Sequence, residues 1–170
     1  VSFWYRFVHR HRSRLEQGAV DEVWRAHVAP YLDDYMGQSV FEPMAEQAFR
    51  RHHAAWDLPA VREWSRWEGQ DRNRRSIEID VVAELDDGRI LSGEVKWSSK
   101  PVDVGLHWRL LRDLDDLARS GEGWAAEALD EETSAGHIYV SAAGFTQRFR
   151  TLAGENGSIR LVSLEDLYID

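Results

Sequence analysis

The sequence contains no cysteine, which excludes disulfide bonds and thiolate metal sites and agrees with a reducing, cytoplasmic location. No run approaches the ~18 apolar residues of a membrane-spanning helix, so no membrane association is expected. The N-terminal stretch Val1–Arg6 is too short and too aromatic to be a secretion signal. The phosphate-binding pattern Gly-x4-Gly-Lys-Ser/Thr is also missing, so this chain is not itself a P-loop ATPase.

Lysine is scarce: of the 21 Lys and Arg residues, only Lys96 and Lys100 are lysines. The net charge of −9 argues against a protein that coats nucleic acid along its whole surface. Positive charge is nevertheless concentrated in two places, and each set is explained equally well as solvated side chains in an Arg-rich chain. These sets are Arg6, His9, Arg10, His11, Arg12 and Arg14 near the N-terminus, and Arg72, Arg74 and Arg75 in mid-chain.

The 170 residues are enough for one domain with a proper core. We expect a linker arm of aromatic and basic residues over 1–18 and a folded domain over 19–170. Periodicity and turn residues predict an element order α-α-β-β-β-α-β-α-β-α, which is an α/β mixed sheet with helices on both faces. The expected helices are Val20–Tyr35 (interrupted at Pro30 and ended by Gly37), Pro43–His53, Asp103–Arg119, Gly144–Leu152 and a last helical turn that opens at Ser163–Asp166. The expected strands are Val61–Trp67, two strands within Ser76–Trp97, His137–Ala142 and Ile159–Val162.

The stretch Ser76–Trp97 predicts a β-hairpin, because two alternating runs flank Asp86-Asp87-Gly88. A three-residue loop pairs Leu85 with Arg89, places Asp80 opposite Glu94 and places Glu78 opposite Lys96. It also gathers the apolar residues on the other face: Ile77, Ile79, Val81, Ala83, Leu85, Leu91, Gly93, Val95 and Trp97. A two-residue loop would put Asp80 and Glu94 on opposite faces. The apolar pattern therefore favours the odd-length loop.

Two carboxylates directly opposite each other destabilise a sheet by roughly 0.2–1 kcal/mol or more, unless a cation or a shared proton compensates. Oxygen ligands of this kind suit Mg²⁺ or Mn²⁺. A lysine beside them, in a chain whose usual cation is arginine, supplies a compact charge next to a water or a phosphate. A solvated hairpin face without chemistry explains the same spacing about as well.

Glu42 stands directly before Pro43, at the expected start of a helix. Ser39-x-x-Glu42 also matches a capping box, which would give Glu42 a purely structural role. Since proline favours the first helical position, we prefer a helix that starts at Pro43 and leaves Glu42 free to point elsewhere.

These residues resemble the PD-(D/E)xK nuclease superfamily, in Glu42, Asp80 and Glu94-Val95-Lys96. Over nearly the whole chain the sequence is similar to the nuclease-like domain of unknown function at the C-terminus of archaeal-type ATPases, also found in bacteria. Its supporting stretches are Phe3-Trp4-Tyr5-Arg6-Phe7, Tyr35-Met36-Gly37, Phe41-Glu42, Glu78-Ile79-Asp80 and Gly93-Glu94-Val95-Lys96-Trp97. The resemblance implies a restriction-endonuclease-like αβββαβ core, an ATPase partner in cis or in trans, and a chain excised from or shortened relative to such an ATPase.

The resemblance also implies a Mg²⁺- or Mn²⁺-dependent nuclease acting on DNA. Asp80, Glu94, the Val95 carbonyl and Glu42 would bind the metal, and Lys96 would act on the attacking water. A nuclease-fold module that no longer cuts, and instead binds DNA or docks on an ATPase, is the alternative. Oligomeric state, including a homo-oligomer, stays open. The seven histidines lack the spacing of a metal site.

Tryptophans that lie on apolar helix stripes or strand faces are better explained by core packing than by base stacking. We expect Trp24, Trp64, Trp97 and Trp108 in the core, and the pattern does not place Trp67.

Overall fold

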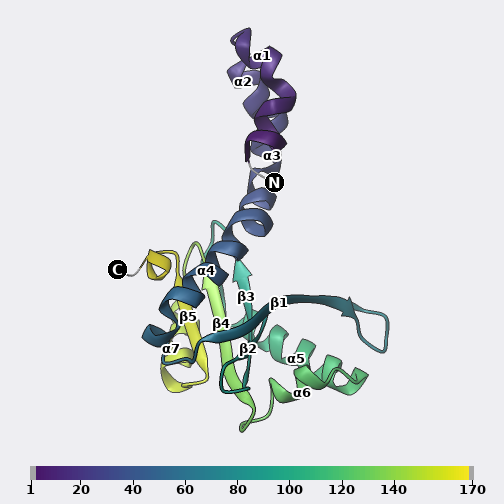
Figure 1. The fold of residues 1–170 in the computed structure, drawn as a ribbon, viewed down its shortest axis with the longest axis vertical. Helices are drawn as coiled ribbons and strands as arrows, with labels where there is room; N and C mark the ends of the chain where they lie inside the picture. The colour runs from purple at the N-terminus through teal and green to yellow at the C-terminus, as the bar shows by residue number, and fades with distance from the viewer. Residues whose placement is uncertain (1–2, 169–170) are drawn as a thin grey trace.

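A five-stranded sheet forms the centre of the computed structural model, which describes residues 3–168 apart from the side chain of Gln38. The spatial order is β1-β2-β3-β4-β5, in which β1–β2 and β2–β3 pair antiparallel and the remaining pairs are parallel (Figure 1). The strands are β1 (Val61–Gln70), β2 (Ser76–Leu85), β3 (Ile90–Lys96), β4 (Ser134–Ser141) and β5 (Ile159–Ser163). The predicted mixed sheet is confirmed.

Helices cover both faces of this sheet. On one face, α4 (Glu42–His52) packs Ala45, Ala48 and Phe49 against the second half of β2 and against β3, β4 and β5. The other face carries α5 (Gly105–Ser120), α6 (Gly123–Glu127) and α7 (Gln147–Glu155). A 3₁₀ turn, Glu165–Tyr168, follows β5. The order α4-β1-β2-β3-α5-β4 is the αβββαβ core expected from the sequence.

The buried stripe of α5 consists of Leu106, Leu110, Leu114 and Leu117. Trp108 was expected on this stripe, and that prediction is wrong because its side chain is 51% exposed. Two residues along a helix correspond to about 200° of rotation, so Trp108 faces away from Leu106 and Leu110. Trp64 and Trp97 do pack partly buried against the α4 core, and Trp67 packs against the α5 core.

A helical hairpin precedes the sheet and projects away from it (Figure 1). Its first arm joins a π-helical turn Trp4–Val8, a 3₁₀ turn His9–His11 and α1 (Arg12–Glu16). Its second arm joins α2 (Val20–Val23), a π turn Trp24–Val28, α3 (Ala29–Asp34) and a π turn Tyr35–Phe41, which runs directly into α4. Phe7, Val28 and Tyr35 are buried between the arms.

Of the two breaks expected in this second arm, the interruption at Pro30 is observed, since a π turn ends at Val28 and α3 begins at Ala29, whereas the helix end at Gly37 is wrong. Pro30 lies in the first turn of α3, where a missing N–H is tolerated. Gly37 lies inside a π turn and not at a helix end. Trp24 is also misplaced by the prediction, since it is 47% exposed. The division into residues 1–18 and 19–170 stays a prediction, and Val1, Ser2, Ile169 and Asp170 lie outside the described residues.

None of the helices in the described part of the chain is long and apolar enough to cross a membrane.

Candidate metal-binding active site

The β2–β3 hairpin has the register predicted from its odd-length loop. Val81 pairs with Gly93 and Ala83 pairs with Leu91, and the Leu85 N–H donates to the Arg89 carbonyl at 2.9 Å. Gly88 takes φ +84°, the left-handed conformation that the loop requires. One step beyond Val81 and Gly93, this register brings Asp80 next to Glu94.

A β-bulge at Asp80–Val81 changes the rest of the expected pattern. On β1, Trp67 pairs with Ile79 and Ser65 pairs with Val82, so two residues of β2 oppose only Arg66. Ile77 and Ile79 therefore pack with the α5 core, whereas Val81 packs with the α4 core. The single apolar face predicted for β2 is wrong for this reason.

The described β2–β3 pairing ends at Val81–Gly93, so Glu78 does not pair with Lys96 as expected. Bulges re-aim side chains next to functional sites, and here the bulge lies at the candidate acid Asp80.

Asp80, Glu94 and Lys96 meet at this bulge. Asp80 and Glu94 are 6% and 7% exposed, which is unusual burial for carboxylates. Asp80 Oδ2 accepts from the Val95 backbone N–H at 3.0 Å and from Lys96 Nζ at 2.7 Å. Lys96 Nζ also forms an ion pair with Glu94. One ammonium thus bridges two buried carboxylates, as the predicted grouping requires.

Burial and the neighbouring charges shift the pKa values of Glu94 and Lys96. Burial raises the pKa of Glu94 to about 7; Lys96 and Arg109 oppose this rise and Asp80 adds to it. Burial alone would lower the pKa of Lys96, but the charges of Glu94 and Asp80 outweigh it and the pKa of Lys96 is raised. Lys96 therefore remains an ammonium at neutral pH.

Glu42 lies at the first position of α4, next to this cluster, and is partly buried. Because the helix continues from the preceding π turn, Glu42 is not at a free helix start, and neither the capping box nor the start at Pro43 is observed. Arg66 lies 3.8 Å from Glu42 and also ion-pairs with Glu78. Burial raises the pKa of Glu42, and the charge of Asp80 contributes to the rise.

The residues present fit a hard divalent cation in part. Asp80 and Glu94 offer oxygen ligands of the kind that Mg²⁺ and Mn²⁺ prefer, and the Val95 carbonyl belongs to the same strand end. Within residues 3–168, however, no three His, Asp or Glu side chains form a group that could hold an ion. Glu42 is thus near the carboxylate pair without completing a ligand set.

The carboxylate pair borders a hollow of about 330 Å³, whose lining includes Lys96, Arg75, Arg109 and Asp113. Arg75 is neutralised there by Asp71, Asp113 and Asp116, at 2.8 Å from each of the last two.

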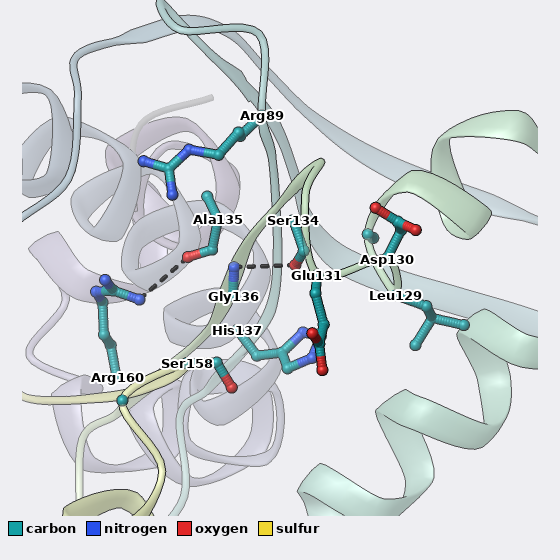
Figure 2. Close-up of a pocket in the computed structure, with 12 residues that line it drawn as sticks. Arg89, Leu129, Asp130, Glu131, Ser134, Ala135, Gly136, His137, Ser158 and Arg160 are labelled. Atoms are coloured by element: carbon teal, nitrogen blue, oxygen red, sulfur yellow. Dashed lines mark hydrogen bonds between the residues drawn. The ribbon is translucent and has the colours of Figure 1, made fainter.

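Another hollow of about 330 Å³ opens at the other end of β4, between Arg89, Glu131, His137 and Arg160 (Figure 2). Arg160 donates to the carbonyls of Trp56 and Ala135, and Arg89 pairs with Asp87. Of these two hollows, the one lined by the buried pair Asp80 and Glu94 is the better candidate for chemistry.

A family model described as "Archaea bacterial proteins of unknown function", DUF234, matches residues 4–108. The chain belongs to the DUF234 family. The match spans the helical hairpin, α4, β1, β2 and β3, and so includes Glu42, Asp80, Glu94 and Lys96. The resemblance to a domain of unknown function found in archaea and bacteria, drawn from the sequence, is thereby confirmed at the level of the family.

Solved structures similar to this DUF234 chain include a repair endonuclease from Pyrococcus abyssi, at 16% identity and a TM-score of 0.41, covering 71% of this chain and 46% of that one. A protein of unknown function, AF1548, matches at 17% identity and a TM-score of 0.40, covering 75% and 60%. An EndoMS–dsDNA complex matches at 13% identity and a TM-score of 0.38, covering 72% and 44%. The chain thus spans about half the length of these proteins. No curated protein matches the sequence.

Sequence reasoning missed a row of polar side chains beside the carboxylates of this DUF234 domain. On β4, His137, Tyr139 and Ser141 pair with Ser92, Glu94 and Lys96 of β3. His137 Nδ1 lies 2.8 Å from Ser92 Oγ, and His107 Nδ1 of α5 lies 2.7 Å from the Tyr139 hydroxyl. Ser141 Oγ is buried without a hydrogen-bond partner in the described part of the chain. The alternation of His137, Tyr139 and Ser141 with Ile138 and Val140 is the signal that could have identified this row.

Proposed function

We propose that the chain is a metal-dependent nuclease domain that hydrolyses phosphodiester bonds in DNA. The observation that supports this most strongly is the convergence of Asp80, Glu94 and Lys96 at one bulge, beside an open hollow. Buried carboxylates kept together with a lysine are costly to the fold, which favours a functional reason for them.

Asp80, Glu94 and the Val95 carbonyl are the proposed ligands of Mg²⁺ or Mn²⁺, with Glu42 reaching the ion directly or through water. When bound, the ion supplies Lewis acidity toward the phosphate and lowers the pKa of a water. Lys96 stays charged and can orient the attacking water and stabilise negative charge developing on the phosphate. The Val95 N–H holds Asp80 in place through its 3.0 Å hydrogen bond.

The test is cleavage of single-stranded and duplex DNA, and of RNA, with MgCl₂ or MnCl₂. We expect activity in wild-type protein and a loss of at least about 100-fold in Asp80→Asn and in Lys96→Gln. Glu68→Gln, a change at the surface of the β1–β2 hairpin, is the control and should cleave normally. The proposal fails if the wild-type chain cuts none of these substrates with either metal.

A nuclease-fold module that no longer cuts is the second candidate, and one observation favours it. Lys96 satisfies both carboxylates by itself, and no third acid joins them in the described part of the chain. Calorimetric titration with MnCl₂ separates the two candidates. Binding at millimolar Mn²⁺ that disappears in Asp80→Asn supports the nuclease, whereas no binding supports the module.

The sequence resemblance supports an ATPase module as a partner, in cis or in trans, with the N-terminal hairpin as its link. DNA as a partner follows from the proposed chemistry. The cysteine-free composition supports a cytoplasmic location.

A further inference from the structure

Arg109 lies on α5 beside the carboxylate site, and it lines two hollows at once. The first is the hollow of about 330 Å³ that contains Asp80, Glu94 and Lys96. The second, of about 340 Å³, starts at Lys96 and Arg109 and extends toward the loop after β3. The two hollows therefore share a wall made of Lys96 and Arg109, one cation from the sheet and one from the helix that covers it.

The positive charge of Arg109 has no counterion among residues 3–168, whereas its neighbours do have partners. On the same helix, Arg112 lies 3.7 Å from Asp113 and Arg119 lies 3.0 Å from Asp115. Across the first hollow, Arg75 is held by three aspartates. Arg109 instead opposes the rise that burial causes in the pKa of Glu94, so its charge acts on the carboxylate pair. An exposed guanidinium without a partner at this position is available to an anionic ligand.

The lining of the second hollow combines cationic and apolar side chains. Lys96, Lys100 and Arg109 are its cations, and Trp97, Pro101, Val102 and Leu106 supply its apolar part. The loop that carries Lys100 is braced by Ser98 Oγ, which donates to the Lys100 carbonyl at 2.7 Å.

Asp103 is the acidic side chain in the lining of the second hollow. Its carboxylate already accepts from the Gly105 N–H at 3.1 Å and from the Thr146 hydroxyl at 3.0 Å. These hydrogen bonds engage the acid locally, so the three cations of the lining determine which charge the hollow favours.

We propose that the second hollow binds the nucleotide adjoining the scissile bond, with Arg109 and Lys100 contacting phosphates and the apolar residues of the lining contacting the sugar and base. The proposal rests on the proposed nuclease function and adds the path of the DNA strand to it. A lining that combines cations with apolar surface matches a phosphodiester chain, in which phosphates alternate with less polar sugar and base. A free phosphate would use only the cations of this lining.

The experiment measures DNA binding by fluorescence anisotropy without divalent metal, so that no cleavage occurs, using a labelled 20-nucleotide single strand and its duplex. The variants are Arg109→Gln and Lys100→Gln in the full chain. Arg112→Gln and Arg119→Gln are matched controls, since both arginines are exposed on the same helix. Each test variant should bind about fivefold more weakly, and the slope of log K against log[NaCl] should fall by about 0.7–0.9.

The proposed DNA path is supported if Arg109→Gln and Lys100→Gln bind DNA more weakly than the wild type while both control variants bind as the wild type does. Equal weakening in controls and test variants overturns it, as does wild-type binding in Arg109→Gln or an absence of DNA binding by the wild-type chain. The proposed function can fail separately from this DNA path. If the chain binds DNA through Arg109 and Lys100 but never cleaves it, the DNA path stands and the nuclease function fails. If the Arg109→Gln variant cleaves DNA as well as the wild type does, the nuclease function stands and the DNA path fails.

Discussion

Lys96 is the residue on which the stability and the chemistry of the site both depend. It is held by Asp80 and Glu94, which are buried with no other cation in direct contact among the described residues. Removing the Lys96 ammonium leaves the carboxylates of Asp80 and Glu94 side by side, largely shielded from water and without a counterion.

Lys96→Met should therefore destabilise the metal-free protein at pH 8 by about 1–3 kcal/mol, a range reduced because the lysine side chain is 35% exposed. Urea denaturation measures this loss. Adding MnCl₂ should recover most of it, since a divalent cation would replace the missing charge. Lys100→Met, the other lysine, is the control and should change stability little. An equal loss with and without Mn²⁺ would contradict this role of the ammonium.

His137 supplies a pH dependence that is separate from the carboxylate site. Burial, with a contribution from His107, lowers the pKa of His137 from 6.5 to about 4. The Nδ1 atom of His137 forms a hydrogen bond with the Ser92 hydroxyl. His137 also lines a hollow whose other charged residues are Arg89, Asp130, Glu131 and Arg160. The folded protein thus keeps His137 neutral between pH 6.5 and pH 4, where the unfolded chain binds a proton.

Because the unfolded state takes up that proton, the free energy of unfolding should fall as the pH drops from 6.5 toward 4, by on the order of 3 kcal/mol for this histidine. His137→Gln lacks the titration and should show a shallower pH dependence in urea denaturation over this window. Parallel pH profiles for the variant and the wild type would show that His137 is not the responsible group.

At the scale of elements, the hairpin was predictable and its bulge was not. Alternation over Ser76–Trp97 and the Asp87-Gly88 pair determine the loop length, and the loop length determines that Asp80 and Glu94 meet. The bulge opposite Arg66 depends on how β1 bends across β2, and no glycine in β2 marks it. Local pattern therefore identified the pair of acids but not the change of face at Ile79.

The N-terminal helices show a similar limit. Pro30 and Gly37 normally end helices, and the sequence pattern accordingly predicts breaks at both. A π turn directly before α3 and a second one that contains Gly37 let the helical path continue into α4, supported by burial of Phe7, Val28 and Tyr35. Glu42 consequently lies inside a continuous helix, a position that periodicity alone could not provide.

The close approach of strands β3 and β4 beside the site requires a glycine at position 93. A Cβ at this position would lie 2.1 Å from the Ile138 carbonyl oxygen of β4, and a backbone atom in a central strand has little freedom to move. Gly93→Ala should separate β3 from β4 next to Glu94, with a loss of stability of about 2–4 kcal/mol measured by urea denaturation.

Gly123→Ala is the matched control, because a Cβ added at Gly123 would meet nothing within 4 Å, so the change should be nearly neutral. Gly93→Ala with wild-type stability would contradict the close approach of β3 and β4.

At the scale of the whole molecule, one face of the sheet combines the core with the chemistry. The α5 side carries Glu94 and Lys96, the polar row of β4, and the two hollows that meet at Arg109. In this acidic chain of net charge −9, Lys96 and Arg109 line both of these hollows beside the carboxylate pair. This arrangement required tertiary structure to be seen, because Arg109 and Lys100 belong to no motif in the sequence.

The central claim is that Asp80 and Glu94 form a metal site beside a charged Lys96. A crystal structure of the protein soaked in MnCl₂, with anomalous scattering to identify manganese, tests it most directly. We predict one ion with oxygens of Asp80 and Glu94 at roughly 2.0–2.3 Å and with Lys96 Nζ moved away from at least one carboxylate. A structure at millimolar Mn²⁺ in which Lys96 still bridges both carboxylates, with no anomalous peak between them, would contradict it.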